Sequence, residues 1–109
     1  EKVAADTMVG GATLTGLLGT SAWYAPGAAA SSVVEAILRD QKKVIPSCCY
    51  LEGEYGLNDI CIGVPAVIGR GGVEKVIEIE FTAEEKAKFE ASAAAVAKTN
   101  AILSEIGAL

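Results

Sequence analysis

The sequence contains no histidine among its 109 residues. Histidine is the side chain that most often moves protons near neutral pH, and it is the commonest metal ligand. Without it, no Ser–His, Cys–His or His–metal site can be completed within this chain. If the chain belongs to an enzyme that needs a histidine, that residue lies elsewhere.

Positive charge is also scarce, with 9 Lys and Arg against 14 Asp and Glu, a formal net charge of −5 and a pI of about 4.6. An acidic surface does not suit nucleic-acid phosphates or anionic lipid, so we expect no nucleic acid and no membrane as partner. The hydrophobic share of 51% exceeds the 21% that is charged, which excludes intrinsic disorder. The length predicts one domain with a real core.

Cysteine is limited to Cys48, Cys49 and Cys61. The count is odd and two are adjacent, so neither a disulfide framework nor a C-x-x-C redox motif is present. Three thiols without histidine fall short of the four ligands of a structural zinc site, so we expect no metal. We interpret the cysteines as small buried hydrophobes in a reducing, cytoplasmic compartment, with a reactive or regulatory thiol as the alternative.

A starting methionine is missing too, since the sequence opens E-K-V, and no signal peptide follows. We therefore expect an internal point of a longer polypeptide. A processed N-terminus is the alternative.

Charge is absent from Thr7 to Val34, a run of 28 residues. The run is long enough to span a membrane but contains few bulky apolar side chains, which argues against a span. Its spacing predicts a helix from Val3 to Leu18 and a second from Ala22 or Pro26 to Asp40. We expect both helices to be buried on several sides or to face a partner subunit.

The second half predicts three strands and a long helix. The expected strands run from Lys43 to Leu51, from Ile60 to Ile68 and from Val73 to Phe81, with Pro46 and Pro65 as interruptions. Short links between them favour an antiparallel meander. A capping box at Thr82 and Glu85 predicts a helix from Ala83 to about Ile106, ended by Gly107. The fold class is α+β: two helices, a three-stranded meander and a long C-terminal helix.

Two features could be mistaken for catalytic or binding motifs. The glycines from Gly69 to Gly72 suggest a phosphate cradle, but a strand follows where a dinucleotide fingerprint needs a helix, so we interpret them as a hairpin loop. Glu52 and Glu54 flank a glycine and could form a carboxylate pair. A solvated turn fits them better.

The most unusual cluster runs from Thr20 to Pro26 and places hydroxyls and two aromatic residues at a helix start. Helix N-terminal amides can meet an anion there, although packing alone also accounts for the cluster. Ser21 has no histidine available as a base, so we do not expect a nucleophilic role for it.

At this cluster the sequence resembles the lactate-dehydrogenase-like malate dehydrogenases. S-A-W-Y-A-P, from Ser21 to Pro26, is similar to their S-A-Y-Y-A-P. In order there follow L-E-G-E-Y-G from Leu51, I-G-V-P from Ile62 and V-I-G-R-G-G-V-E-K-V-I-E from Val67, each similar to a family motif. The resemblance covers essentially the whole chain but only the C-terminal part of the family.

The resemblance implies that residues 1–109 are the C-terminal substrate domain of an NAD-dependent malate dehydrogenase of the tricarboxylic acid cycle, which interconverts malate and oxaloacetate. The NAD-binding Rossmann domain, the relay His–Asp pair and the substrate-binding arginines would precede this segment. No catalytic residue maps onto this chain. Ser21 and Ala22 match the wall of the substrate pocket, Pro26 a position near the nicotinamide, and the helix from Ala28 to Asp40 pocket and subunit-contact elements of a homodimer or homotetramer.

We therefore expect the isolated chain to be inactive. One alternative, from another class, is a stand-alone α+β module whose uncharged helices form a homo-oligomer interface. Another is a lactate dehydrogenase segment, because substrate choice in the family depends strongly on residues outside this chain.

Overall fold

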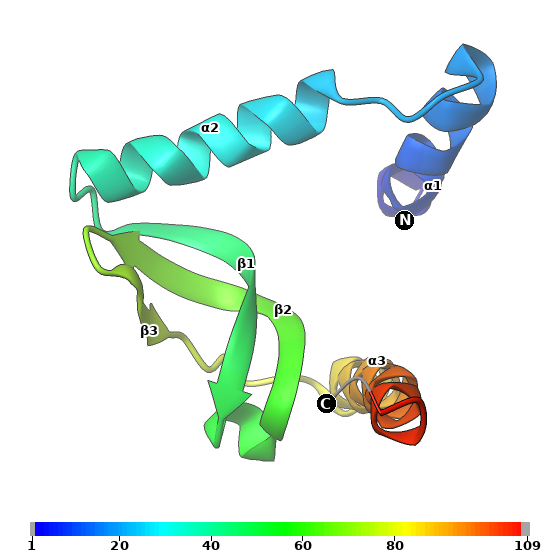
Figure 1. The fold of residues 1–109 in the computed structure, drawn as a ribbon. Coiled ribbons are helices and arrows are strands. Elements are labelled where there is room, and N and C mark those ends of the chain that lie inside the picture. The colour runs from blue at the N-terminus through cyan, green and yellow to red at the C-terminus, as the bar shows by residue number, and fades with distance from the viewer. Residues whose placement is uncertain (1, 108–109) are drawn as a thin grey trace. The chain divides into compact units, whose positions relative to one another are not determined.

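A computed structural model describes residues 2–107 of the chain and divides it into two compact units, residues 1–35 and 36–109. Figure 1 shows the elements in order along the chain. They are α1 (Lys2–Leu18), α2 (Tyr24–Leu38), β1 (Lys43–Glu52), the 3₁₀ turn η1 (Glu54–Gly56), β2 (Asn58–Gly69), β3 (Gly72–Val76) and α3 (Ala83–Glu105). This sequence of elements confirms the predicted α+β class.

The first unit contains α1, which has no buried residue. The helix ends at Gly19, which takes the left-handed conformation with φ of 68° and donates its N–H to the Thr15 carbonyl at 3.0 Å. Large apolar side chains of this helix are exposed to solvent: Met8 is 86% exposed and Leu17 is 80% exposed. Within the described residues α1 is therefore not buried on several sides, and the alternative, that it faces a partner subunit, stays a prediction.

α2 ends two residues earlier than the sequence predicts. Asp40 donates its N–H to the Ile37 carbonyl at 3.1 Å, and Gln41 donates to the Ala36 carbonyl at 2.9 Å. These two bonds form a Schellman motif, in which one residue after the helix takes a left-handed conformation. Asp40 occupies that position with φ of 50°, although glycine is the usual residue there. The sequence therefore has no glycine that would indicate the end of α2.

The second unit is built on an antiparallel sheet in the order β1–β2–β3, which confirms the predicted meander (Figure 1). Alternate side chains face one side, as the two-residue period of a strand requires. The buried set is Cys49, Leu51, Ile60, Ile62, Val64, Ala66 and Ile68. α3 packs against β2, where Ala93 is buried.

Pro46 and Pro65 do not interrupt the strands, contrary to the prediction, because they lie opposite each other in the β1–β2 pairing. The Pro65 carbonyl accepts the N–H of Ile77, so the backbone polar groups of Pro65 point away from β1. The missing N–H of Pro65 therefore removes no hydrogen bond from the β1–β2 ladder. The sequence cannot show this, because it does not reveal which two residues are cross-strand partners.

β3 ends at Val76, five residues before the predicted end at Phe81. Pro65 has no N–H to give to the Ile77 carbonyl, and the Tyr55 hydroxyl donates to that carbonyl instead at 2.7 Å. The same hydroxyl accepts the N–H of Ile79 at 3.1 Å. A tyrosine side chain thus replaces the ladder hydrogen bonds just after β3.

The predicted capping box is confirmed at the start of α3. Thr82 donates its N–H to the Glu85 carboxylate at 2.9 Å, and Glu85 donates its N–H to the Thr82 hydroxyl at 3.3 Å. Gly107, with φ of 66°, follows the end of the helix as predicted.

The cysteines agree only in part with their interpretation as buried hydrophobes. All three are free thiols, but Cys49 alone is buried, whereas Cys48 and Cys61 are exposed. Cys48 and Cys61 belong to the alternation that faces away from the buried set, which explains their exposure. Among the described residues, no helix has the length and apolar character needed to cross a lipid bilayer.

Candidate functional site

The candidate site predicted from the sequence lies where α1 gives way to α2. Residues 21–23 form the link, and Pro26 falls in the first turn of α2. The first four N–H groups of a helix have no partner inside it, so a proline there loses nothing. The Trp23 carbonyl accepts the N–H of Gly27 at 2.8 Å and so begins the helical hydrogen bonding.

The three predicted site residues have different surroundings. Ser21 and Pro26 are exposed, and Ala22 is half-buried. Their neighbours Trp23 and Tyr24 are 63% and 87% exposed, although aromatic rings of this size are usually covered in a folded protein. The link therefore presents small side chains flanked by bare aromatic surface.

The side chains of this link can shape a surface, but they do not form a catalytic or metal-binding group on their own. No histidine exists in the sequence, so Ser21 has no such base within this chain. No group of three or more His, Cys, Asp or Glu among residues 2–107 could hold a metal ion. Small uncharged side chains at a helix start can shape a cavity wall, and this is what Ser21 and Ala22 offer.

The two other motifs have structural explanations. The Glu54 carboxylate accepts the N–H of Glu52 at 2.8 Å, and this hydrogen bond lowers the Glu54 pKa below its ordinary value. The Glu54 side chain therefore stabilises the turn between β1 and η1, and Glu52 takes part in that turn through its backbone N–H. The glycine loop joins β2 to β3 in a hairpin, with Gly72 at φ of 86°, as predicted.

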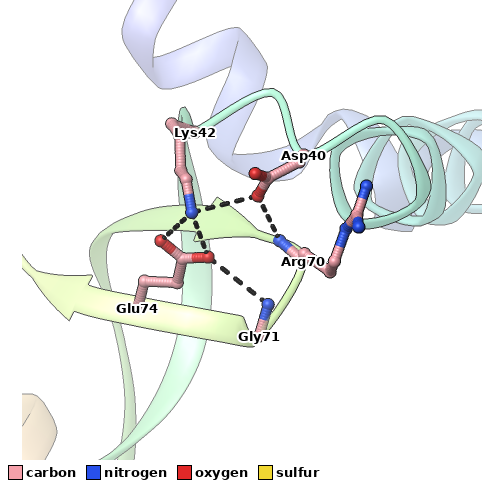
Figure 2. A network of polar contacts seen from close by, with 5 residues as sticks. All are labelled: Asp40, Lys42, Arg70, Gly71 and Glu74. Atoms are coloured by element: carbon pink, nitrogen blue, oxygen red, sulfur yellow. Dashed lines mark hydrogen bonds and ion pairs between the residues drawn. The ribbon is translucent and has the colours of Figure 1, made fainter.

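A polar network that the sequence analysis missed lies where this hairpin meets the chain leaving α2 (Figure 2). The Lys42 ammonium is 2.5 Å from the Glu74 carboxylate and 3.0 Å from that of Asp40. The Asp40 carboxylate also accepts the N–H of Arg70 at 2.7 Å, and Glu74 accepts that of Gly71 at 3.3 Å. We call Asp40, Lys42 and Glu74, with the amides of Arg70 and Gly71, the Lys42 network.

These contacts shift the three ionisable groups in the directions that favour their charges. The bond from the Arg70 amide, and then Lys42, lower the pKa of Asp40, while Lys42 and then the Gly71 amide lower that of Glu74. The Glu74 carboxylate, and then Asp40, raise the pKa of Lys42. Asp40 and Lys42 are separated from Glu74 by more than thirty residues, so only the hairpin register could have predicted the network.

Comparison with known proteins places this fold and this link in one class. Residues 3–103 match the family model of the lactate/malate dehydrogenase α/β C-terminal domain, and the chain belongs to this family. Its relatives include the malate dehydrogenase of Bacteroides thetaiotaomicron, 68% identical over all 109 residues, and that of Parabacteroides distasonis, 63% identical. The chain spans about a third of their length, 35% of each.

Solved structures agree with the family. The malate dehydrogenase of Salinibacter ruber superimposes with a TM-score of 0.89 at 46% identity, over 97% of this chain and 36% of that one. The lactate dehydrogenase of Eimeria maxima, solved with NADH and oxamate, also gives 0.89, at 36% identity over 95% of this chain and 33% of that one. The S-A-W-Y-A-P link therefore belongs to a dehydrogenase C-terminal domain.

Proposed function

We propose that the complete protein carrying this segment is an NAD-dependent malate dehydrogenase that interconverts malate and oxaloacetate, as in the tricarboxylic acid cycle. The observation that carries the proposal is identity of 61–68% to malate dehydrogenases over 97–100% of the chain. This similarity favours malate over lactate, because the relatives that share this level of identity are malate dehydrogenases.

In this proposal the link before α2 is one wall of the substrate pocket. The methyl group of Ala22 leaves room for the second carboxylate of malate, which lactate lacks. Ser21 lies beside it, and Pro26 fixes the backbone near the nicotinamide. In this proposal the preceding part of the protein supplies the proton relay, because this chain has no histidine. It also supplies the arginines that bind the carboxylates, because Arg39 and Arg70 match no catalytic motif of the family.

The residues of this chain do not by themselves fit NAD. A dinucleotide needs a glycine-rich turn that opens a helix, whereas the glycine loop here joins two strands. The space where a Gly69 side chain would lie is filled by Glu74 and Lys42, which leaves no cradle for a pyrophosphate. We therefore assign NAD to the preceding domain, and this chain's part is to shape the pocket and exclude water.

The bare apolar side chains of α1 and α2 support two further parts of the proposal. Leu17, Trp23 and Tyr24 are each more than 60% exposed, so they suit contact with the preceding domain or with another subunit of a homodimer or homotetramer. The three free cysteines support a reducing, cytoplasmic location.

The test is a comparison of substrates in the complete protein. With NADH present, we expect kcat/KM for oxaloacetate to exceed that for pyruvate by at least about a hundred-fold. Comparable values, or a preference for pyruvate, would contradict the proposed activity.

A further inference from the structure

We propose that Cys48 and Cys61 form a dithiol site for trivalent organoarsenicals of the type R–As=O, whose arsenic atom bonds to two sulfurs at once. Both residues are free thiols exposed on the sheet of the second unit. Neither takes part in the proposed dehydrogenase activity, so the site is a further property of this chain.

The first step is that both thiols lie on the same face of the sheet. In the β1–β2 pairing Cys48 lies opposite Gly63. Two residues along, Cys61 lies opposite Tyr50. Burial alternates along both strands and places these residues on the face that points away from the core. Cys49 belongs to the other face and is only 3% exposed, so the third thiol takes no part.

The second step is that the pairing brings the two side chains close together. Pro46 and Pro65 face each other, and the backbone polar groups of Pro65 point away from β1, so this pair is not hydrogen-bonded. Such pairs recur at every second position of an antiparallel ladder, and their side chains approach most closely. The pairs that contain Cys48 and Cys61 are therefore of this kind. The two cysteines are diagonal neighbours, whose Cα atoms are typically about 7–8 Å apart with the Cβ atoms closer.

The third step is that the space beside the two thiols is open. Gly63 has no side chain that could separate them, and a Cβ built there would meet no atom of the described residues within 4 Å. The Tyr50 hydroxyl donates a hydrogen bond to the Asp59 carboxylate at 2.5 Å. This bond draws the Tyr50 ring toward the start of β2 and away from Cys48. The two thiols therefore share an open stretch of the sheet surface.

The fourth step is that a pair of sulfurs selects this kind of ligand. No group of three or more His, Cys, Asp or Glu among residues 2–107 could hold a metal ion, and structural zinc needs four ligands. A disulfide closes without backbone movement only when the Cα atoms are within about 7 Å, so a diagonal pair is at or beyond its limit. A trivalent arsenic atom that already carries one organic group needs just two sulfurs, and it lengthens the bridge by one atom.

The reaction exchanges oxygen for sulfur on arsenic and leaves both elements in their oxidation states. The As=O bond and two S–H bonds break, two As–S bonds form, and the oxygen leaves with both protons as one water molecule. The second As–S bond closes within the protein. Because this step is intramolecular, we expect the pair to hold the arsenical about a hundred-fold more tightly than a single thiol does.

The experiment treats the reduced, complete protein with phenylarsine oxide, removes singly bonded reagent with excess mercaptoethanol and counts the retained phenylarsenic groups by intact mass spectrometry. We expect the wild type to retain one group per chain more than Cys48→Ser or Cys61→Ser. Each variant should need about a hundred-fold more reagent to be labelled to the same extent. Dimercaptopropanol, a competing dithiol, should release the group. Cys49→Ala, on the buried face, is the matched control and should retain it.

Equal retention by the wild type and the two serine variants would overturn the inference. Loss in only one of these variants would also overturn it, because a single reactive thiol accounts for that result. If a serine variant does not fold, alanine at the same exposed position decides by the same criteria. Loss of the group in a folded Cys49→Ala protein would contradict the assignment of the site to the outer face.

Discussion

At the scale of single residues, two side chains carry most of the account. Ala22 is the residue whose size matters for the substrate in the proposed function, and Tyr55 is the residue whose hydroxyl shapes the sheet. The role of Ala22 follows from the sequence motif around it. That of Tyr55 does not, because its partners Ile77 and Ile79 lie more than twenty residues away.

We expect Ala22→Leu to lower kcat/KM for oxaloacetate by about ten- to two-hundred-fold in the complete protein, because the added side chain occupies the space proposed for the second carboxylate. Activity with pyruvate should fall less. Ala91→Leu, at an exposed position of α3, is the matched control and should change neither value. An equal loss with both substrates would mean that Ala22 does not select between them.

We expect Tyr55→Phe to lower the free energy of unfolding by about 1–2 kcal/mol, because it removes two hydrogen bonds at the end of β3. Tyr50→Phe is the control, since the Tyr50 hydroxyl donates a hydrogen bond to the exposed Asp59 carboxylate at the surface. Its effect should stay within about 0.5 kcal/mol. Urea denaturation followed by circular dichroism measures both, and equal effects would remove the special role of Tyr55.

At the scale of elements, local sequence patterns predicted the helices and the meander. The continuity and the ends of the strands depended on pairing across the sheet, which those patterns do not show. The capping box at Thr82 and Glu85 is complete within four residues, so the start of α3 could be predicted to the residue. Pro46 and Pro65 were misinterpreted because their harmless position depends on facing each other. The end of α2 was missed because Asp40 adopts the conformation usually left to glycine.

The Lys42 network should make this corner of the second unit sensitive to acid. Hydrogen bonds from Lys42 and the Gly71 amide lower the pKa of Glu74, and those from the Arg70 amide and Lys42 lower that of Asp40. Because the folded pKa lies below the unfolded one, the stabilisation is complete above pH of about 4.3. It is lost as the pH falls through the folded values.

We therefore expect the difference in unfolding free energy between the wild type and Glu74→Gln to be largest near neutral pH. It should narrow as the pH approaches about 3. Glu90→Gln, which removes the loose 3.9 Å pair with Lys86, serves as the control and should differ little from wild type at either pH. If the difference in unfolding free energy between the wild type and Glu74→Gln grew on acidification, the pKa of Glu74 would not be lowered by folding.

At the scale of the whole molecule, the proposed function gives one explanation for the absence of histidine and for the exposed apolar side chains of α1 and α2. The chain spans about a third of the length of its malate dehydrogenase relatives, and the sequence motifs alone predicted the family and its C-terminal domain. The uncharged run predicted helices that are buried on several sides or face a partner subunit, and Leu17 and Tyr24 are exposed. In the proposed function, the preceding domain or another subunit covers them.

The most direct test of the account is oxaloacetate-dependent oxidation of NADH, followed at 340 nm with the 109-residue chain and with the complete protein. We predict no turnover by the chain alone, because it has no histidine and no dinucleotide turn. The complete protein should be active, and adding the separately produced preceding part to the chain should restore activity. Turnover by the chain alone, or none by the complete protein, would contradict the claim that this chain is one wall of a malate dehydrogenase pocket.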